Sequence, residues 1–178
     1  TMYKHDQPFV TPKYPITVPT NLYYSTPCVY RLNLGKAGKF YIGKAMSLPQ
    51  TMTQIAVQIE RSFRTHNNDE SGWFYHIIAY IIKNRVMGAT VERMHEEMKE
   101  ATWELLKLEQ EQLNKHKNNP NCLNNNFDVY IPKWITPEQV ELFKQWKNDT
   151  DKANRNKHTA SNARKKHKRG QLAVRSVG

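Results

Sequence analysis

The chain has few cysteines and no long apolar run. Two cysteines, Cys28 and Cys122, stand among 178 residues, too few for a disulfide framework or a structural zinc site. We interpret both as small buried hydrophobic residues. No apolar stretch approaches the length of a membrane span, and the N-terminus lacks a charged-then-apolar signal pattern. We therefore expect an intracellular, reducing compartment (cytoplasm, nucleoid or organelle) and no secretion.

Acidic residues are also scarce. Asp and Glu number 16 against 27 Lys and Arg, which gives a formal net charge of +11. Such an excess indicates a polyanionic partner, either nucleic acid or an anionic membrane surface, and we expect nucleic acid, DNA in preference to RNA, and no membrane. The apolar fraction of 38% lies below the globular average, so we expect one core with unpacked appendages. We interpret the asparagine runs as compositional drift.

Composition divides the chain into three parts. Residues 1–27 contain five prolines, which exclude a regular helix and favour an extended arm lying on the domain or on a partner. Residues 28–132 hold the patterned, core-forming sequence. Residues 133–178 form a C-terminal extension, in which 149–178 carries nine basic and two acidic residues, a net charge of +7, and too little apolar surface for a packed core.

The densest basic cluster lies in this extension. It admits three interpretations: a disordered solubilising end, a nuclear-type address, or an arm that contacts nucleic acid. Since the tail has no aromatic residue, contact with phosphates is the expected mode, and base stacking is not. The residues that we expect to contact nucleic acid here are Arg164, Lys165, Lys166, Lys168 and Arg169.

Alternating apolar residues between 28 and 45 predict a β-hairpin closed by a glycine-containing turn. Its two tyrosines, Tyr30 and Tyr41, fall close enough across the ladder to converge on one site. Gly43 permits a bend or a close backbone approach just past the second strand. Periodicity and breakers predict the remaining elements, which are helices over 54–66, 73–83, 97–117 and 136–147 and a strand over 89–94.

Glu109 is the informative residue of the predicted 97–117 helix. It lies on the apolar stripe of that helix, four residues after Leu105 and four before Leu113. A carboxylate on a buried face is costly unless it is paired, hydrogen-bonded or bound to a metal. Glu109 therefore either lies at the edge of the stripe, pairs with an arginine, or belongs to a functional site.

The triplets Cys28-Val29-Tyr30 and Tyr41-Ile42-Gly43, followed by Glu109 and then Asn124, resemble the GIY-YIG nuclease family, of the homing-endonuclease, phage or mobile-element type. The resemblance covers about residues 28–124. It implies an α/β domain with a small antiparallel sheet flanked by helices, and it implies hydrolysis of DNA phosphodiester bonds. Two separated motifs with the expected element types between them make the pattern more specific than either motif alone.

The resemblance also implies roles for single residues. Glu109 would hold one divalent metal, Mg²⁺ or Mn²⁺, with water filling most of its coordination sphere. Tyr30 would be the general base, which requires a nearby cation because free tyrosine has a pKa of about 10. Tyr41 would position the phosphate or the nucleophile, and Asn124 completes the catalytic set. Gly43, Lys44 and Arg64 are expected to contact nucleic acid.

The arginine of the family has no direct counterpart. The register places Ser62 at its position, after an apparent insertion over 46–53, and we choose Arg61 as the catalytic arginine. The alternative for Arg61 and Arg64 is a solvated or phosphate-contacting surface charge. His66 and His76 are proton carriers near the site, residues that hydrogen-bond to the ligands of the metal, or structural histidines.

Two functions remain open at this point. The first is a metal-dependent endonuclease, which the joint presence of Tyr30, Tyr41, Glu109 and Asn124 favours. The second is a catalytically silent module of the same fold that binds nucleic acid in a ribonucleoprotein or a virion. The displaced arginine and the proline-rich and basic ends favour this second function.

Overall fold

The computed structural model describes residues 8–22, 26–65, 74–98 and 100–175, with side chains up to 169. The chain divides into two compact units, Thr1–Pro132 and Lys133–Gly178. Within the described residues, no helix combines the length and the apolar character that crossing a bilayer requires. Residues 8–22 of the segment that we predicted to form an extended arm over 1–27 belong to the first of these units.

The predicted hairpin forms the centre of the first unit. Strands β3 (Cys28–Leu34) and β4 (Lys39–Ala45) pair antiparallel, and β5 (Ala89–Arg93) joins the other edge of β3, also antiparallel. Gly35 and Gly38 take φ angles of 70° and 78° in the turn, a backbone region that glycine enters without steric cost. The alternation of apolar residues thus predicted both the hairpin and the third strand.

The proline-rich segment completes the sheet. Strands β1 (Phe9–Val10) and β2 (Ile16–Val18) extend it to the order β1-β2-β5-β3-β4, and a 3₁₀ turn, η1 (Thr20–Leu22), follows. Because β2 runs parallel to β5, the sheet is mixed, and the expectation of a purely antiparallel sheet is wrong. Ile16 and Val18 are completely buried, so this extended segment belongs to the core.

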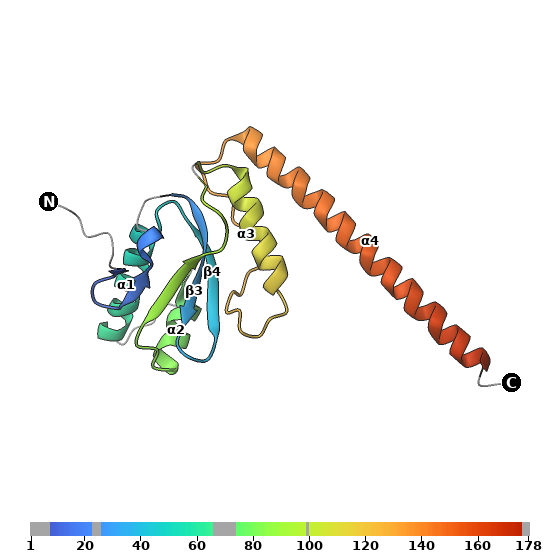
Figure 1. The fold of residues 1–178 in the computed structure, drawn as a ribbon, viewed down its shortest axis with the longest axis horizontal. Coiled ribbons are helices and arrows are strands. Elements are labelled where there is room, and N and C mark those ends of the chain that lie inside the picture. The colour runs from blue at the N-terminus through green and yellow to red at the C-terminus, as the bar shows by residue number, and fades with distance from the viewer. Residues whose placement is uncertain (1–7, 23–25, 66–73, 99, 176–178) are drawn as a thin grey trace. The chain divides into compact units, whose positions relative to one another are not determined.

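Helices cover both faces of the sheet (Figure 1). Helices α1 (Leu48–Thr65) and α2 (Tyr75–Lys83) pack over the larger hydrophobic cluster, which includes Tyr30 and Leu32 of β3. Helix α3 (Trp103–His116) packs over a second cluster, in which Phe40 and Ile42 of β4 point toward it. The α/β architecture with flanking helices, as inferred from the sequence, is confirmed.

Two helix starts differ from the prediction for local reasons. Helix α1 begins at Leu48, inside the segment interpreted as an insertion, because Pro49 is well tolerated in a first helical turn. Helix α3 begins at Trp103 and not near residue 97, because the hydroxyl of Thr102 caps it and accepts a hydrogen bond from the backbone N–H of Glu104 at 3.3 Å.

The second unit contains one helix, α4 (Pro137–Arg175). The predicted start is confirmed, and the hydroxyl of Thr136 accepts a hydrogen bond from the backbone N–H of Gln139 at 3.4 Å. The predicted end near Lys147 is wrong. No glycine or proline occurs from 138 to 169, so nothing in the local sequence stops the helix there.

Candidate active site

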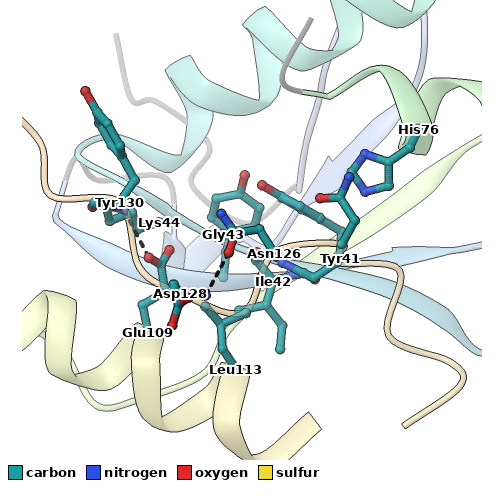
Figure 2. A pocket seen from close by; sticks show the side chains of 13 residues that line it. Tyr41, Ile42, Gly43, Lys44, His76, Glu109, Leu113, Asn126, Asp128 and Tyr130 are labelled. Carbon is teal, nitrogen blue, oxygen red and sulfur yellow. Dashed lines mark hydrogen bonds and ion pairs between the residues drawn. The ribbon is translucent and has the colours of Figure 1, made fainter. Parts of the chain in front are cut away.

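A pocket of about 450 Å³ lies beside β4, between α3 and the chain that follows α3 (Figure 2). Strand β4 is the last strand of the sheet, so side chains from both faces of the sheet can reach the pocket around its outer edge. The residues that line it come from the hairpin, α2, α3 and the 124–130 loop. They are Tyr30, Tyr41, Ile42, Gly43, Lys44, His76, Glu109, Leu113, Asn124, Asn125, Asn126, Asp128 and Tyr130.

Because Gly43 has no side chain, the rings of Tyr30 and Tyr41 can lie close to its backbone in β4. Tyr30 pairs with Gly43 in the strand register, and a Cβ atom on Gly43 would lie only 2.5 Å from the Tyr30 hydroxyl oxygen. The ring of Tyr30 therefore occupies the space that a side chain at position 43 would need. Its centroid lies 6.3 Å from that of Tyr41, so both phenols belong to the same pocket wall.

Both phenols are held in the neutral form. Burial raises the pKa of Tyr30 well above its ordinary value, and the neighbouring Tyr41 and Glu109 raise it further. Burial also raises the pKa of Tyr41, and Glu109 adds to this effect. Each hydroxyl is therefore a hydrogen-bond donor at neutral pH, and Tyr30 is poorly suited to the role of general base that the resemblance implies.

Glu109 is buried on α3 and forms an ion pair with Lys44. Its Oε1 lies 3.0 Å from the Lys44 Nζ, and the residue is only 6% exposed (Figure 2). Burial raises the pKa of the Glu109 carboxyl, and the Lys44 ammonium opposes that rise. The Lys44 Nζ also donates to the backbone oxygen of Tyr130 at 3.0 Å, so one ammonium joins β4, α3 and the loop.

Two amide side chains hold the 124–130 loop against the domain. Asn124 accepts from the Ile42 N–H at 2.9 Å and donates to the Ile42 carbonyl at 2.8 Å, as a neighbouring strand would. Gln110, 2% exposed, donates to the Phe127 carbonyl at 2.7 Å and accepts from the Val129 N–H at 3.1 Å. The Asn124 amide is thus engaged at both ends, which makes it a positioning residue and not a group directed at substrate.

The pocket therefore joins two neutral phenols, a buried carboxylate paired with an ammonium, and a loop fixed by amides. No protein-family model, curated protein or solved structure matches this chain. Any function assigned to the pocket follows from the side chains themselves.

The predicted arginines lie outside the pocket. Arg61 and Arg64 are exposed on α1 and are absent from the pocket lining, and Arg64 lies 4.0 Å from the Glu60 carboxylate. Ser62 is the residue of this group that faces inward, 8% exposed. Among the lining residues that the structure describes, Lys44 is the one Lys or Arg side chain. The catalytic role expected for Arg61 therefore has no support in its placement, because its position on the helix turns it to solvent.

His76 lies at the α2 end of the pocket (Figure 2). Its Nε2 is 2.8 Å from the Leu123 carbonyl, so this nitrogen must carry the proton and donate. Its Nδ1 is buried and has no hydrogen-bond partner among the residues that the structure describes. His66, the other histidine considered as a proton carrier, lies outside the described residues.

The donor set suits a hard divalent cation held mainly by water. Glu109 and Asp128 are the carboxylate residues of the pocket lining, and Asn126, whose Oδ1 already accepts a hydrogen bond from the Asp128 N–H at 3.0 Å, lines it too. In the part of the chain that the structure describes, no three His, Cys, Asp or Glu side chains gather to form a metal cluster. Mg²⁺ needs few protein ligands, so the set fits it, although the Lys44 ammonium already occupies one side of Glu109.

Sequence reasoning missed several lining or loop-holding residues, chiefly Gln110, Asp128 and Tyr130. The signal for part of this loop was visible as the asparagine run 124–126, which we interpreted as compositional drift and which lines the pocket. Of the residues expected to contact nucleic acid, Gly43 and Lys44 line the pocket, whereas the basic residues of the tail are exposed on α4. Both cysteines are buried, as expected of small hydrophobic residues.

Proposed function

We propose that this protein is a divalent-metal-dependent endonuclease that hydrolyses DNA phosphodiester bonds, through a GIY-YIG-like module at about residues 28–124. The observation that carries the proposal is the presence of Tyr30, Tyr41 and the buried Glu109 around one pocket. Glu109 is separated from the hairpin by more than sixty residues of sequence, so its position beside both tyrosines is a property of the folded domain. A buried carboxylate at the edge of a pocket has a clear use in holding a cation.

In this proposal the phenols act as donors. The hydroxyls of Tyr30 and Tyr41 stay protonated because their pKa values are raised, and they hydrogen-bond to non-bridging oxygens of the scissile phosphate. Glu109 and Asp128 would hold the metal, which as a Lewis acid stabilises the charge on the phosphate and on the leaving oxygen. Lys44 adds a positive charge on the same side of the pocket.

We assign the proton acceptor to His76. Its Nδ1 has no protein partner, and its ring is oriented by the hydrogen bond from Nε2 to the Leu123 carbonyl. Histidine is the side chain that most often takes up a proton in general acid–base catalysis, and a nucleophilic water at this end of the pocket would pass its proton to Nδ1. This assignment replaces the role of Tyr30 as general base.

The alternative is a catalytically silent module that binds nucleic acid as a structural protein of a ribonucleoprotein or a virion. Two observations favour it. The Glu109 carboxylate already has a partner in Lys44, and Ser62 occupies the inward-facing position where the family carries arginine. In a silent module the ion pair would serve only to fix the 124–130 loop.

Nicking of supercoiled plasmid DNA separates the two functions. The full chain is incubated with Mg²⁺ or Mn²⁺ and, in parallel, with an excess of chelator, and Glu109→Ala is assayed beside it. The endonuclease proposal predicts open-circular product with metal, none with chelator and none with the variant. A wild-type chain that binds plasmid but leaves it supercoiled with either metal would support the silent module.

A further inference from the structure

The C-terminal helix α4 carries positive charge that no acidic residue on the same stretch neutralises. From Lys152 to Arg169 the chain has eight Lys or Arg and no Asp or Glu. Every side chain from 151 to 169 is exposed. Like charges four residues apart on a helix repel each other, as Lys165 and Arg169 do. A polyanion lying along the helix would relieve this repulsion.

The basic residues are unevenly placed around the helix. Successive residues are turned by about 100°, so a spacing of three or four keeps side chains on one face. The front face, as we name it, carries both arginine and amide groups and consists of Arg155, His158, Asn162, Lys165 and Arg169. One flank carries Lys157, Arg164 and Lys168, and the other carries Lys152 and Lys166. The back face consists of the uncharged or small residues Ala153, Asn156, Ala160 and Ala163, together with His167.

This distribution matches a helix lying in a groove. Lysine and arginine on two flanks can contact the phosphates of two opposite walls. The front face between the flanks presents the side chains that read base edges, because arginine pairs with guanine and asparagine pairs with adenine. The back face, which has no Lys or Arg, would be left toward solvent.

The length of the basic segment and the chemistry of its side chains favour B-form DNA over duplex RNA and over single strands. The basic segment from Lys152 to Arg169 is about 25 Å long at 1.5 Å per residue, and the major groove of B-form DNA is wide enough to admit an α-helix. The major groove of A-form RNA is too narrow. No aromatic residue follows Trp146, so the segment has no platform on which the bases of a single strand could stack.

We propose that α4 binds in the major groove of B-form duplex DNA, with its front face toward the base edges. The proposal rests on DNA as the partner named in the proposed function. It does not require that the pocket cleave DNA. The helix would anchor the chain on a duplex through contacts of its own.

Two matched double variants test this orientation. His158→Glu with Asn162→Glu adds two negative charges to the front face, and Asn156→Glu with Ala160→Glu adds the same two charges to the back face at the same spacing. Both use glutamate, a good helix former, and circular dichroism checks that the helix content is unchanged. Binding of the full chain to a labelled DNA duplex of about two helical turns is measured by fluorescence anisotropy in chelator, so that cleavage cannot contribute.

The front variant should weaken binding to the DNA duplex by about tenfold or more, the cost of one or more lost base contacts, and the back variant should leave binding close to that of the wild type. An RNA duplex of the same sequence should bind more weakly and should not distinguish the two variants. Equal weakening by the two variants would overturn the proposal, because it would show that only net charge matters. Equal binding of RNA and DNA duplexes would overturn it too. If the chain shows this binding pattern but does not cleave DNA when Mg²⁺ is present, the result counts against the proposed endonuclease activity and not against the binding mode of α4.

Discussion

Replacing Gly43 by alanine tests the close approach on which the pocket wall depends. The new Cβ would lie 2.5 Å from the Oη of Tyr30, 2.6 Å from its Cζ and 3.0 Å from the Cε1 of Tyr41. The ring of Tyr30 is 1% exposed, so it cannot move aside without disturbing the core. Overpacking of this kind costs about 1–3 kcal/mol.

A second effect of the Gly43→Ala change acts in the opposite direction, so the sign of the change in the free energy of unfolding decides the test. Gly43 does not have a positive φ, and a Gly→Ala change at such a position without overlap stabilises a protein by about 0.4–1 kcal/mol through the unfolded chain. We expect a net loss in the free energy of unfolding of about 1–2 kcal/mol, which lowers Tm by about 2–4 °C per kcal/mol.

Urea unfolding and thermal melting of the wild type and of Gly43→Ala measure this loss. In a Tyr30→Leu background, which removes both overlapping atoms of the ring, the same change should cost much less. An unchanged or more stable Gly43→Ala protein would show that Tyr30 does not lie against the backbone of Gly43. An equal loss of stability from Gly43→Ala in the wild-type and Tyr30→Leu backgrounds would lead to the same conclusion.

Three further predictions follow from the site and its surroundings. Tyr30→Phe should lower the cleavage rate by about 10²–10³-fold, the cost of one donor to the phosphate, without moving the pH profile, and a shift of the profile would restore Tyr30 as the base. Arg61→Ala and Arg64→Ala should both leave single-turnover cleavage nearly unchanged because both side chains are exposed, and a large loss for Arg61→Ala alone would contradict their placement. The Nε2 of His95 accepts a hydrogen bond from the Val29 N–H at 2.9 Å, and burial lowers the pKa of His95. Neutral His95 therefore contributes its full stabilisation above the ordinary pKa of about 6.5. This stabilisation is lost as the pH falls through the lowered pKa. Lowering the pH through that lowered pKa should reduce the urea midpoint more for the wild type than for His95→Gln. An equal reduction in both proteins would refute this prediction.

Local pattern predicted the fold where one period dominated the sequence. Alternation over 28–45 and 89–94 identified β3, β4 and β5, because burial alternates along most of each strand. The short strands β1 and β2 lie among prolines, and their pairing with each other and with β5 depends on contacts distant in sequence. Helix ends depended on single residues, such as the Thr102 cap, that outweighed the periodicity.

Only the site residues that belong to a recognisable sequence pattern were predicted. Tyr30, Tyr41 and Glu109 stood out because tyrosines on a hairpin and a carboxylate on an apolar stripe are visible in sequence. The 124–130 loop was not, because its position is set by hydrogen bonds between its backbone atoms and the side chains of Gln110 and Lys44. The partner of Glu109 was also hidden, since Lys44 lies 65 residues away.

Two variants of α3 test whether Glu109 holds a metal for DNA cleavage. Glu109→Gln keeps an oxygen for Lys44 but removes the charge that binds a cation, and Glu111→Gln makes the same change at an exposed position, where the carboxylate lies 4.0 Å from Lys107. Single-turnover cleavage of a DNA duplex with Mg²⁺ is measured for both variants, together with DNA binding in chelator. We expect Glu109→Gln to lose cleavage and keep binding, whereas Glu111→Gln should keep both. Cleavage by Glu109→Gln at the rate of Glu111→Gln would contradict this expectation.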